Sequence, residues 1–402
     1  GRVTQKSVDG LLATDYTFDA AGNIASISTG NPTYFSYDPY DRLIEKIDPE
    51  GNKTIVSYTE GDQLLIKTIR DPRGVETIET YNAHNLLVKR EIPGSLLEEF
   101  SYDNALRLTA QDHLSFTYTP GGYKASLSEA GRRRTSWSYT PGGKVRSKCK
   151  PDGTILEYAY NSQGQLIQMG LREFLHDPLG RLIGGTGFKR ELDPFGNILK
   201  EEFSSGLAIE SSFDAWDRPI ERILPDQSRI HYQYDGPFLR TVTRSDAHDA
   251  VLYTHHYDTF DAQGNLLQEM GAFATSYAYD KSNRRIFQQS PYLAEQLAYD
   301  PSGNLVQKGD KSYAYDAACQ LIAERGQFEA QYDTHYNCIG KNGESFSVDL
   351  CNQLQGQTYD ENGNLLRPDF VYDPFDQLIV AAGKNFTFDA LGRRLSSGDA
   401  AC

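Results

Sequence analysis

The sequence predicts an all-β fold in which tandem β-hairpins form one sheet that coils into a spiral shell. Three observations predict it. A phrase of aromatic residue, aspartate, turn and aliphatic pair recurs along the 402 residues. Tyrosine, phenylalanine and glycine are abundant, which suits pleated strands and tight turns. Successive copies commonly lie 16 residues apart, as from Asp300 to Asp316, too close for helical repeats of about 33 residues.

Each phrase opens with a predicted strand. Aromatic side chains alternate before the aspartate, as in Tyr313 and Tyr315 or in Phe386 and Phe388. Alternation with period two places successive side chains on opposite faces of a strand. The strand is expected to end at the last aromatic residue, because a turn sequence follows it directly.

The next residues predict a tight turn. In Asp300–Gly303 the carboxylate can accept backbone N–H groups two residues on, and proline fixes φ at the second turn position. Glycine supplies the left-handed residue that forms the bulge of a hairpin loop. Asp, Asn or Arg replaces this glycine in other copies, and Asp and Asn tolerate that conformation best. The aliphatic residues after the turn open the returning strand.

Neighbouring hairpins are expected to pair side by side. About forty strands spaced about 4.8 Å apart make a ribbon that cannot stay flat, because strands twist. The sheet therefore coils, which buries an aromatic and aliphatic layer and hides open edges. We interpret residues 1–402 as one continuous segment with irregular loops near residues 236–256 and 326–358. The chain starts inside the repeat pattern without methionine, so we expect a fragment of a longer protein.

The aromatic, aspartate and glycine positions of the phrase are the predicted structural signature. They are Phe18, Asp19, Gly22, Tyr37, Asp38, Tyr102, Asp103, Tyr160, Gly164, Asp177, Gly180, Asp193, Gly196, Phe213, Asp214, Phe260, Asp261, Gly264, Tyr279, Asp280, Tyr299, Asp300, Gly303, Tyr315, Asp316, Tyr359, Asp360, Gly363, Tyr372, Asp373, Phe388, Asp389 and Gly392. Because the same aspartate recurs with every repeat, we expect it to order a turn rather than to serve a glycosidase as acid or base.

Composition and motifs argue against several functions. Lys and Arg number 40 and Asp and Glu 55, giving a formal charge of −15, whereas nucleic-acid binding needs clustered positive charge. No apolar stretch reaches the roughly 18–20 residues that span a bilayer. Each aspartate turn offers one carboxylate, fewer oxygen ligands than a calcium loop needs. We therefore expect no catalytic residues, no metal and no cofactor.

The five cysteines do not form a recognisable site. They are Cys149, Cys319, Cys338, Cys351 and Cys402. None stands in a C-x-x-C pair, which argues against a zinc site or a disulfide framework. We expect buried reduced thiols, and a bridge between Cys338 and Cys351 is the alternative.

The phrase, for example YDPSGNLV at residues 299–306 and YDENGNLL at residues 359–366, resembles the repeat of the Rhs and YD-repeat family. That family includes bacterial Rhs polymorphic toxins, the C component of insecticidal toxin complexes and the animal teneurins. The resemblance covers residues 18–395. It implies a spiral β-sheet shell around a hollow interior, which encloses a toxic C-terminal domain in bacterial relatives and supports cell adhesion in teneurins.

Self-cleavage is not assigned to this chain. Bacterial relatives usually close the shell with a core segment that carries a DP-x-G-L-like motif. Asp177–Gly180 and Asp193–Gly196 look similar to that motif, but both fit the register of the repeats and are interpreted as ordinary turns.

We therefore predict a non-catalytic shell that encapsulates or presents a toxin or effector domain lying outside this chain. The parent protein is expected to be secreted or to stand at the cell surface, although no secretion signal is visible in this segment. Secretion machinery and cell-surface glycans are further expected partners. The alternative is a cell-surface adhesin or carbohydrate-binding repeat module that uses exposed tyrosines. Aromatic residues that face solvent would favour the alternative, and aromatic residues packed within the wall would count against it.

Overall fold

The computed structural model describes residues 2–6, 14–61, 63–129, 131, 133–333, 336–349, 351, 353–398 and 400–401. They form two compact units, and each unit joins two stretches that are distant in the sequence. The first unit combines Gly1–Asp112 with His256–Val348, and the second combines His113–His255 with Asp349–Cys402. We call the earlier member of each pair the first stretch and the later member the second stretch.

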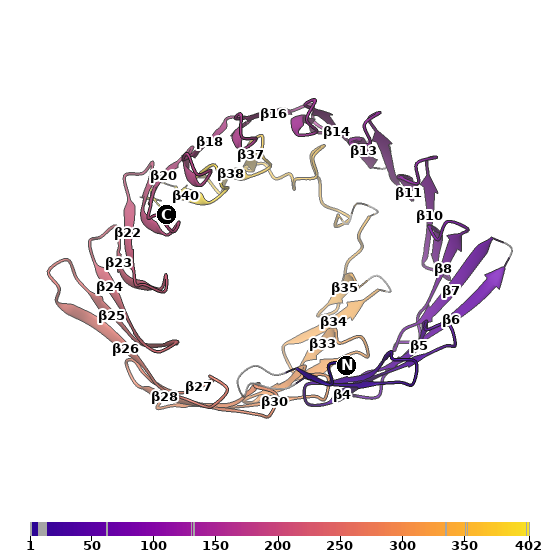
Figure 1. The fold of residues 1–402 in the computed structure, drawn as a ribbon, viewed down its shortest axis with the longest axis horizontal. Coiled ribbons are helices and arrows are strands. Elements are labelled where there is room, and N and C mark those ends of the chain that lie inside the picture. The colour runs from indigo at the N-terminus through magenta and orange to yellow at the C-terminus, as the bar shows by residue number, and fades with distance from the viewer. Residues whose placement is uncertain are drawn as a thin grey trace. The chain divides into compact units, whose positions relative to one another are not determined.

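All regular elements among the described residues are β-strands, which confirms the predicted all-β class (Figure 1). In the described part of the chain, no helix has the length and apolar character needed to cross a bilayer. Within each stretch, every strand pairs antiparallel with the strand that follows it, as the tandem-hairpin prediction requires. Hairpins thus succeed one another without crossover connections.

The strands of the first unit are β1 (Gln5–Lys6), β2 (Thr14–Phe18), β3 (Ile24–Ser28), β4 (Pro32–Tyr37), β5 (Leu43–Ile47), β6 (Lys53–Gly61), β7 (Leu64–Arg70), β8 (Glu76–Asn82), β9 (Leu87–Ile92), β10 (Leu96–Tyr102), β11 (Leu108–Gln111), β27 (Leu266–Met270), β28 (Ala274–Tyr279), β29 (Arg285–Ser290), β30 (Leu293–Tyr299), β31 (Leu305–Lys308), β32 (Lys311–Tyr315), β33 (Leu321–Glu324), β34 (Phe328–Tyr332), β35 (Cys338–Lys341) and β36 (Glu344–Ser345). The strand β26 (Val251–Phe260) begins in the second unit and ends in the first.

The strands of the second unit are β12 (Leu114–Tyr118), β13 (Lys124–Glu129), β14 (Arg133–Tyr139), β15 (Val145–Cys149), β16 (Ile155–Tyr160), β17 (Leu166–Met169), β18 (Arg172–His176), β19 (Leu182–Gly185), β20 (Phe188–Leu192), β21 (Ile198–Phe203), β22 (Ala208–Phe213), β23 (Pro219–Ile223), β24 (Arg229–Asp235), β25 (Phe238–Ser245), β37 (Val371–Tyr372), β38 (Leu378–Ala381), β39 (Lys384–Phe388), β40 (Arg394–Ser397) and β41 (Ala400–Ala401).

Strand ends coincide with the repeated phrase. The signature aromatic residue is the last residue of its strand, as Phe18 is in β2 and Tyr299 is in β30. The pairing register shifts by one residue at this place in both hairpins. Such a shift is a β-bulge, which bends the strand and increases its twist. The bend therefore recurs with the phrase.

The apolar core is thinner than the sequence predicts. The buried apolar side chains among the described residues are Val56, Ile92, Leu156, Phe174, Phe188, Leu297, Ala330, Ala390 and Leu395. Most signature aromatics are only half-buried, because one layer of sheet covers them incompletely. In the second unit, Phe174 and Phe188 from the first stretch cluster with Ala390 from the second. This apolar cluster thus lies where two distant stretches of chain meet.

The predicted irregular loop at residues 236–256 is wrong. This interval contains β25 and the start of β26, joined by a tight turn in which the Asp246 carboxylate accepts N–H bonds from His248 (2.8 Å) and Ala250 (2.9 Å). The turn escaped recognition because Ser245, not an aromatic residue, precedes the aspartate.

The interval 326–358 is partly regular. It begins with β34 and β35, whereas the described residues after β36 are largely irregular up to β37, apart from bridges such as that between Tyr359 and Leu365. The weak strand pattern of the sequence is therefore reproduced only in the later part of this interval.

The four described cysteines are free thiols, and the expectation that the thiols are buried is wrong for two of them. Cys149 and Cys351 are half-buried, whereas Cys319 and Cys338 are exposed. The exposure has a local reason, because Cys319 occupies the left-handed position of a turn (φ 61°) and Cys338 starts the strand after another turn. Cys402 lies outside the described residues.

Candidate functional site at the aspartate turns

The signature residues meet in one recurring turn. In the turn that starts at Asp214, the Oδ1 atom of the carboxylate accepts N–H bonds from Trp216 (2.9 Å) and Arg218 (3.1 Å). The Oδ2 atom accepts a bond from Nε of Arg218 (2.8 Å). The backbone N–H of Asp217 donates to the Asp214 carbonyl (3.1 Å). We call the aspartate and the four residues after it an aspartate turn, and its last member the fifth residue.

The bond from the fifth residue recurs in every signature turn. Oδ1 accepts the backbone N–H of the fifth residue at Asp19, Asp38, Asp103, Asp177, Asp193, Asp214, Asp261, Asp280, Asp300, Asp316, Asp360, Asp373 and Asp389. Burial acts to raise the pKa of Asp177 and of Asp214, but bonds from Arg181 and Arg218 outweigh it and hold each pKa below its ordinary value. These carboxylates are therefore turn-forming anions.

The fourth residue of the turn has positive φ. The signature glycines at this place are Gly22, Gly164, Gly180, Gly196, Gly264, Gly303, Gly363 and Gly392. Leu106 and Cys319 also adopt this conformation, both with φ 61°, at a cost of roughly 1–2 kcal/mol for a residue with a side chain. The prediction that arginine replaces the glycine is wrong, because Asn283 is the left-handed residue of its turn and Arg284 follows it.

Sequence reasoning gave the fifth residue no role beyond opening the returning strand, yet in many turns its side chain bonds to the next turn. Nη1 of Arg181 donates to the Asp193 carbonyl (2.7 Å), and Nδ2 of Asn197 donates to Oδ1 of Asp217 (2.8 Å). Equivalent links start at Asn23, Arg42, Lys144, Gln165, Arg218, Asn265, Arg284, Gln353, Asn364 and Gln377. The sequence feature that could have indicated this role is the polar residue that follows glycine in the phrase.

Some signature tyrosines link their hairpins to the preceding ones. The hydroxyl of Tyr299 donates to the Arg285 carbonyl (2.9 Å), and that of Tyr372 donates to the Leu365 carbonyl (2.9 Å). Tyr102 and Tyr315 make the same kind of bond. Tyrosine suits this position because its ring packs while its hydroxyl finds an acceptor. This role was also missed from the sequence.

In the second unit, aspartate turns of the second stretch lie against the turns of the first stretch that connect one hairpin to the next, which we call connecting turns. Lys150, whose side chain is 3% exposed, donates from Nζ to Oδ1 of Asp376 (2.6 Å) and to the Pro374 carbonyl (3.0 Å). The N–H of Ala390 donates to the Thr186 carbonyl (2.7 Å). Figure 1 accordingly places β38 and β40 beside β18 and β20.

A guanidinium joins two carboxylates where these stretches meet. Arg393 donates from Nη1 and Nη2 to the carboxylate of Glu201 (3.1 Å each) and from Nε to Oδ2 of Asp389 (2.7 Å). The Asp389 side chain is fully buried. Burial acts to raise the pKa of Glu201, but bonds from Arg393 and Arg190 lower it below its ordinary value. These paired charges therefore join Glu201, on a strand of the first stretch, to the Asp389 turn of the second stretch.

The first unit repeats this arrangement with other residues. Arg73 lies in the connecting turn between β7 and β8, where its Nη2 is 2.7 Å from Oδ2 of Asp71. From the second stretch, Gln320 accepts a bond from Nη1 of Arg73 (3.3 Å), and the ring of Tyr336 lies 4.5 Å from its guanidinium. Polar contacts between distant stretches thus occur in both units.

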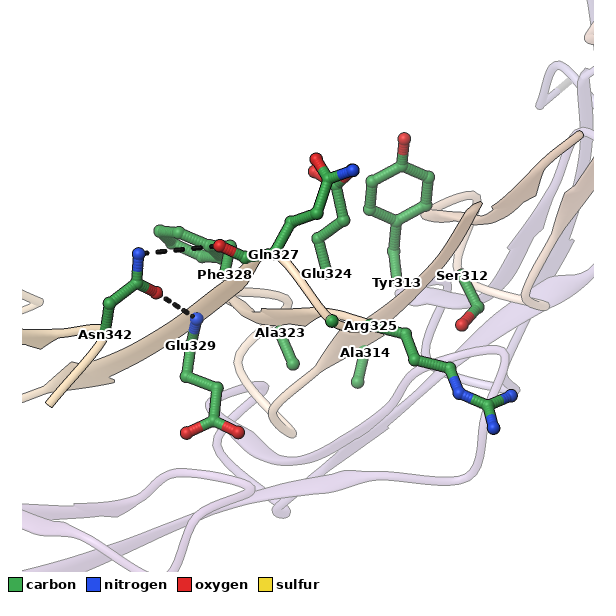
Figure 2. Close-up of a pocket in the computed structure, with 11 residues that line it drawn as sticks. Ser312, Tyr313, Ala314, Ala323, Glu324, Arg325, Gln327, Phe328, Glu329 and Asn342 are labelled. Atoms are coloured by element: carbon green, nitrogen blue, oxygen red, sulfur yellow. Dashed lines mark hydrogen bonds between the residues drawn. The ribbon is translucent and has the colours of Figure 1, made fainter. Parts of the chain in front are cut away.

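An open hollow of about 560 Å³ lies on β32 to β35 in the first unit (Figure 2). Figure 2 shows Glu324 and Glu329 on opposite faces of the sheet, so they do not converge on one point. Glu324 is paired with Nζ of Lys311 (2.8 Å). Within the described part of the chain, no three His, Cys, Asp or Glu side chains gather to hold a metal ion. The contacts described among these residues join strands to one another, and Glu324 and Glu329 do not form a pair of acid and base.

Comparisons with known proteins give the fold its context. No family model matches the chain. It is 22% identical over 436 aligned residues to the double-stranded DNA deaminase toxin A of Burkholderia cenocepacia (strain H111), covering 96% of this chain and 29% of that protein.

Two solved structures share the fold. A crystal structure of TcdB2-TccC3-TEV matches 95% of this chain and 26% of its own length, with a TM-score of 0.63 and 14% identity. The Photorhabdus luminescens Tc holotoxin pore with a TccC3 mutation matches 90% of this chain and 24% of its own length, with a TM-score of 0.62 and 14% identity. The chain spans under a third of the length of each relative. It has the fold of an Rhs/YD-repeat shell, and the resemblance drawn from its repeated phrase is confirmed.

Proposed function

We propose that the chain is one continuous, non-catalytic segment of an Rhs/YD-repeat shell that encloses a toxin or effector domain lying outside it. The observation that carries this proposal is that aspartate turns of a later stretch lie against connecting turns of an earlier stretch. Lys150 with Asp376 and Thr186 with Ala390 are the examples. Contacts of this kind let one polypeptide build a wall in which one stretch of sheet stacks on another. The likeness to TcdB2-TccC3 supports the same reading.

The mechanism is containment. Each hairpin adds two strands, or about 10 Å of wall, at the usual spacing of about 4.8 Å. Tyrosine hydroxyls such as that of Tyr299 bind a hairpin to the one before it, and fifth residues such as Arg181 bind a hairpin to the one after it. The formal charge of −15 keeps such a wall soluble. A wall held in this way separates an enclosed polypeptide from the cell that makes it.

The parent protein is proposed to be secreted or to stand at the cell surface, with secretion machinery as a further partner. The support is that a relative of this sequence is named as a toxin and that the similar structures belong to a Tc holotoxin. A toxin has to leave the producing cell to act on another one, so its container has to travel with it.

The test is protease protection of the domain carried by the complete protein. The coding sequence on both sides of this segment is determined, and the complete protein and the isolated additional domain are expressed. Containment predicts that trypsin digests that domain about tenfold or more slowly within the complete protein, because cleavage follows the population of opened molecules. Equal digestion rates would contradict containment. A complete protein that carries no further domain would contradict it as well.

One observation favours carbohydrate binding as a second candidate. The turn tips Tyr40, Phe195 and Trp216 are 75%, 84% and 76% exposed, and aromatic faces of this kind can stack on sugars. Against this reading, the signature tyrosines are half-buried within the hairpin contacts. A glycan array with the intact chain tests it, and Trp216→Ala should abolish any signal. An array without hits would remove this candidate.

A further inference from the structure

The first stretch of the second unit carries a row of exposed apolar side chains on one edge. The tip of an aspartate turn is its third residue, and the tips Leu179, Phe195 and Trp216 are 76%, 84% and 76% exposed. They stand on three successive turns, which the fifth-residue bonds described above join to one another. We call these three side chains the apolar row. Contiguous apolar side chains of this size on a surface indicate an interaction site.

The tips of the second stretch show what such a row contacts when it is covered. Nδ2 of Asn362 donates to Oδ2 of Asp152 (2.7 Å), in the connecting turn between β15 and β16. The ring centroid of the next tip, Phe375, lies 3.6 Å from the guanidinium carbon of Arg172. A Cβ atom added at Gly170 would lie 3.2 Å from Cζ of the same ring. Successive tips thus lie on successive connecting turns, in the same order along the chain.

The second stretch has free connecting turns on its other edge. Ala382 and Gly383 join β38 to β39, and a Cβ atom added at Gly383 would meet nothing within 4 Å. Beyond β40, a Cβ atom added at Gly398 would meet only Cγ of Lys384, at 3.9 Å. Within the described part of the chain, no other segment therefore covers these two turns.

The free turn at Gly383 is built like the turn that Phe375 covers. Each turn has two residues between paired strand ends, because Met169 pairs with Arg172 and Ala381 pairs with Lys384. Lys384 thus takes the place of Arg172 as the first residue of its strand, and it is exposed. A cation at this place can lie over an aromatic tip, as Arg172 lies over Phe375.

We propose that a second copy of this chain covers the apolar row with the free connecting turns of its own second stretch. In the order seen within the unit, Phe195 of one copy lies on Gly383 and Lys384 of the other. Trp216 then lies on Gly398 of that copy. The spacing fits, because both edges advance by one hairpin, about 10 Å, from turn to turn. The stacking of the two stretches thus continues from one copy to the next, with no enclosed domain required.

The contact joins two different surfaces. Each copy offers one apolar row and one edge of free connecting turns, so contacts between copies run head to tail. Head-to-tail contacts build rings or open chains of copies, whereas a self-complementary surface stops at a dimer. Three turns on each side make a small interface, below the roughly 1,200 Å² of stable complexes, so we expect weak and reversible association.

Sedimentation velocity of the intact chain tests this proposal. The weight-average mass should rise about twofold or more between about 1 and 300 µM protein, the range in which small interfaces associate. A second readout uses a Trp137→Phe background, which leaves Trp216 as the single tryptophan. Quenching of its fluorescence by acrylamide should fall as the mass rises, because association covers the ring. A mass that stays at that of one chain throughout would overturn the proposal.

Matched variants locate the contact. Phe195→Ser combined with Trp216→Ser should abolish the rise in mass. Leu171→Ser removes an equally exposed side chain (82%) from a connecting turn of the first stretch and should keep the rise. Lys384→Glu should weaken association about tenfold, because it sets a carboxylate against the aspartate turns of the other copy. Lys189→Glu makes the same change at an exposed residue of β20 and should have little effect. Association that survives both the double tip variant and Lys384→Glu would overturn the proposal.

A mixture of variants distinguishes head-to-tail stacking from other self-association. The double tip variant keeps its free connecting turns, and Lys384→Glu keeps its apolar row. Mixed in equal amounts, the two should form dimers and nothing larger, because one intact surface remains on each. A mixture that stays monomeric while the wild type associates would overturn the proposal.

Two further outcomes would assign the apolar row to another occupant, contrary to the proposal. A chain that stays monomeric but binds a glycan array through Trp216 would make sugars the occupant. A longer natural protein that is monomeric, and in which acrylamide does not reach Trp216, would make repeat sheet of the same polypeptide the occupant. Protease protection of an enclosed domain is measured separately, so neither outcome decides the proposed function.

Discussion

Replacing Gly187 by alanine is expected to force the two stretches of the second unit apart. Gly187 lies in the connecting turn between β19 and β20 with φ 90°. A Cβ atom added there would lie 2.9 Å from Cβ of Asp389 and from Cδ1 of Leu395, and 3.0 Å from Cα of Asp389. Because the Cα atom of Asp389 belongs to the backbone, the Asp389 turn has to move.

Gly206 offers a matched control. It lies in the connecting turn between β21 and β22 with φ 82°, and a Cβ atom added there meets nothing within 4 Å. Both alanines carry the left-handed penalty of roughly 1–2 kcal/mol. Only Gly187→Ala also overpacks a filled site, which typically costs about 1–3 kcal/mol more. The free energy of unfolding should therefore fall by about 1–3 kcal/mol more for Gly187→Ala than for Gly206→Ala.

The assay is urea unfolding of the wild type and both variants, followed by fluorescence. A local readout accompanies it, because the N–H of Ala390 donates to the Thr186 carbonyl (2.7 Å). Exchange of this amide should speed up in Gly187→Ala and stay unchanged in Gly206→Ala. Equal losses of stability in the two variants, with equal exchange at Ala390, would refute the reasoning that stacking depends on this close approach.

Three further predictions follow from the same geometry. Glu201→Gln removes the charge that pairs with Arg393 and should lower the free energy of unfolding by about 1–3 kcal/mol, whereas Glu202→Gln on the exposed face should change it little in the same urea titration. The turn aspartates with lowered pKa stabilise the fold above their ordinary pKa of about 3.9, so stability should hold between pH 6 and pH 5 and fall below pH 4. Stability that stays constant down to pH 3 would contradict this role. Cys319 and Cys338 should react with a maleimide faster than the half-buried thiols, measured by mass spectrometry of labelled peptides, and equal rates would contradict their exposure.

The turns could be predicted from the sequence because their requirements are local. Aspartate, proline and glycine contain within four residues the acceptor, the fixed φ and the left-handed conformation that a hairpin end needs. The strand end at Tyr299 and its bulge follow from the same four residues. Recognition failed at Asp246, where Ser245 replaces the aromatic residue, although the turn chemistry is intact.

Contacts between repeats could not be predicted in this way. The partner of Arg181 is the Asp193 carbonyl, which depends on how two hairpins are aligned. The ion pair of Lys150 with Asp376 joins residues separated by 226 positions, and neither residue signals the other locally. The expectation of a deep aromatic layer failed for a related reason, because the degree of burial depends on how the stretches meet rather than on the repeat.

The links between aspartate turns all point the same way along the chain. Where a fifth residue bonds to the next hairpin turn, it is the donor, as Arg181 is to Asp193 and Asn197 is to Asp217. During synthesis, each new hairpin therefore meets a donor that is already in place. It follows that the wall can be fastened in step with translation, from the N-terminal side onward. Nascent chains arrested at successive lengths would show protease resistance rising one hairpin at a time, whereas resistance that appears only in the finished chain would exclude this order.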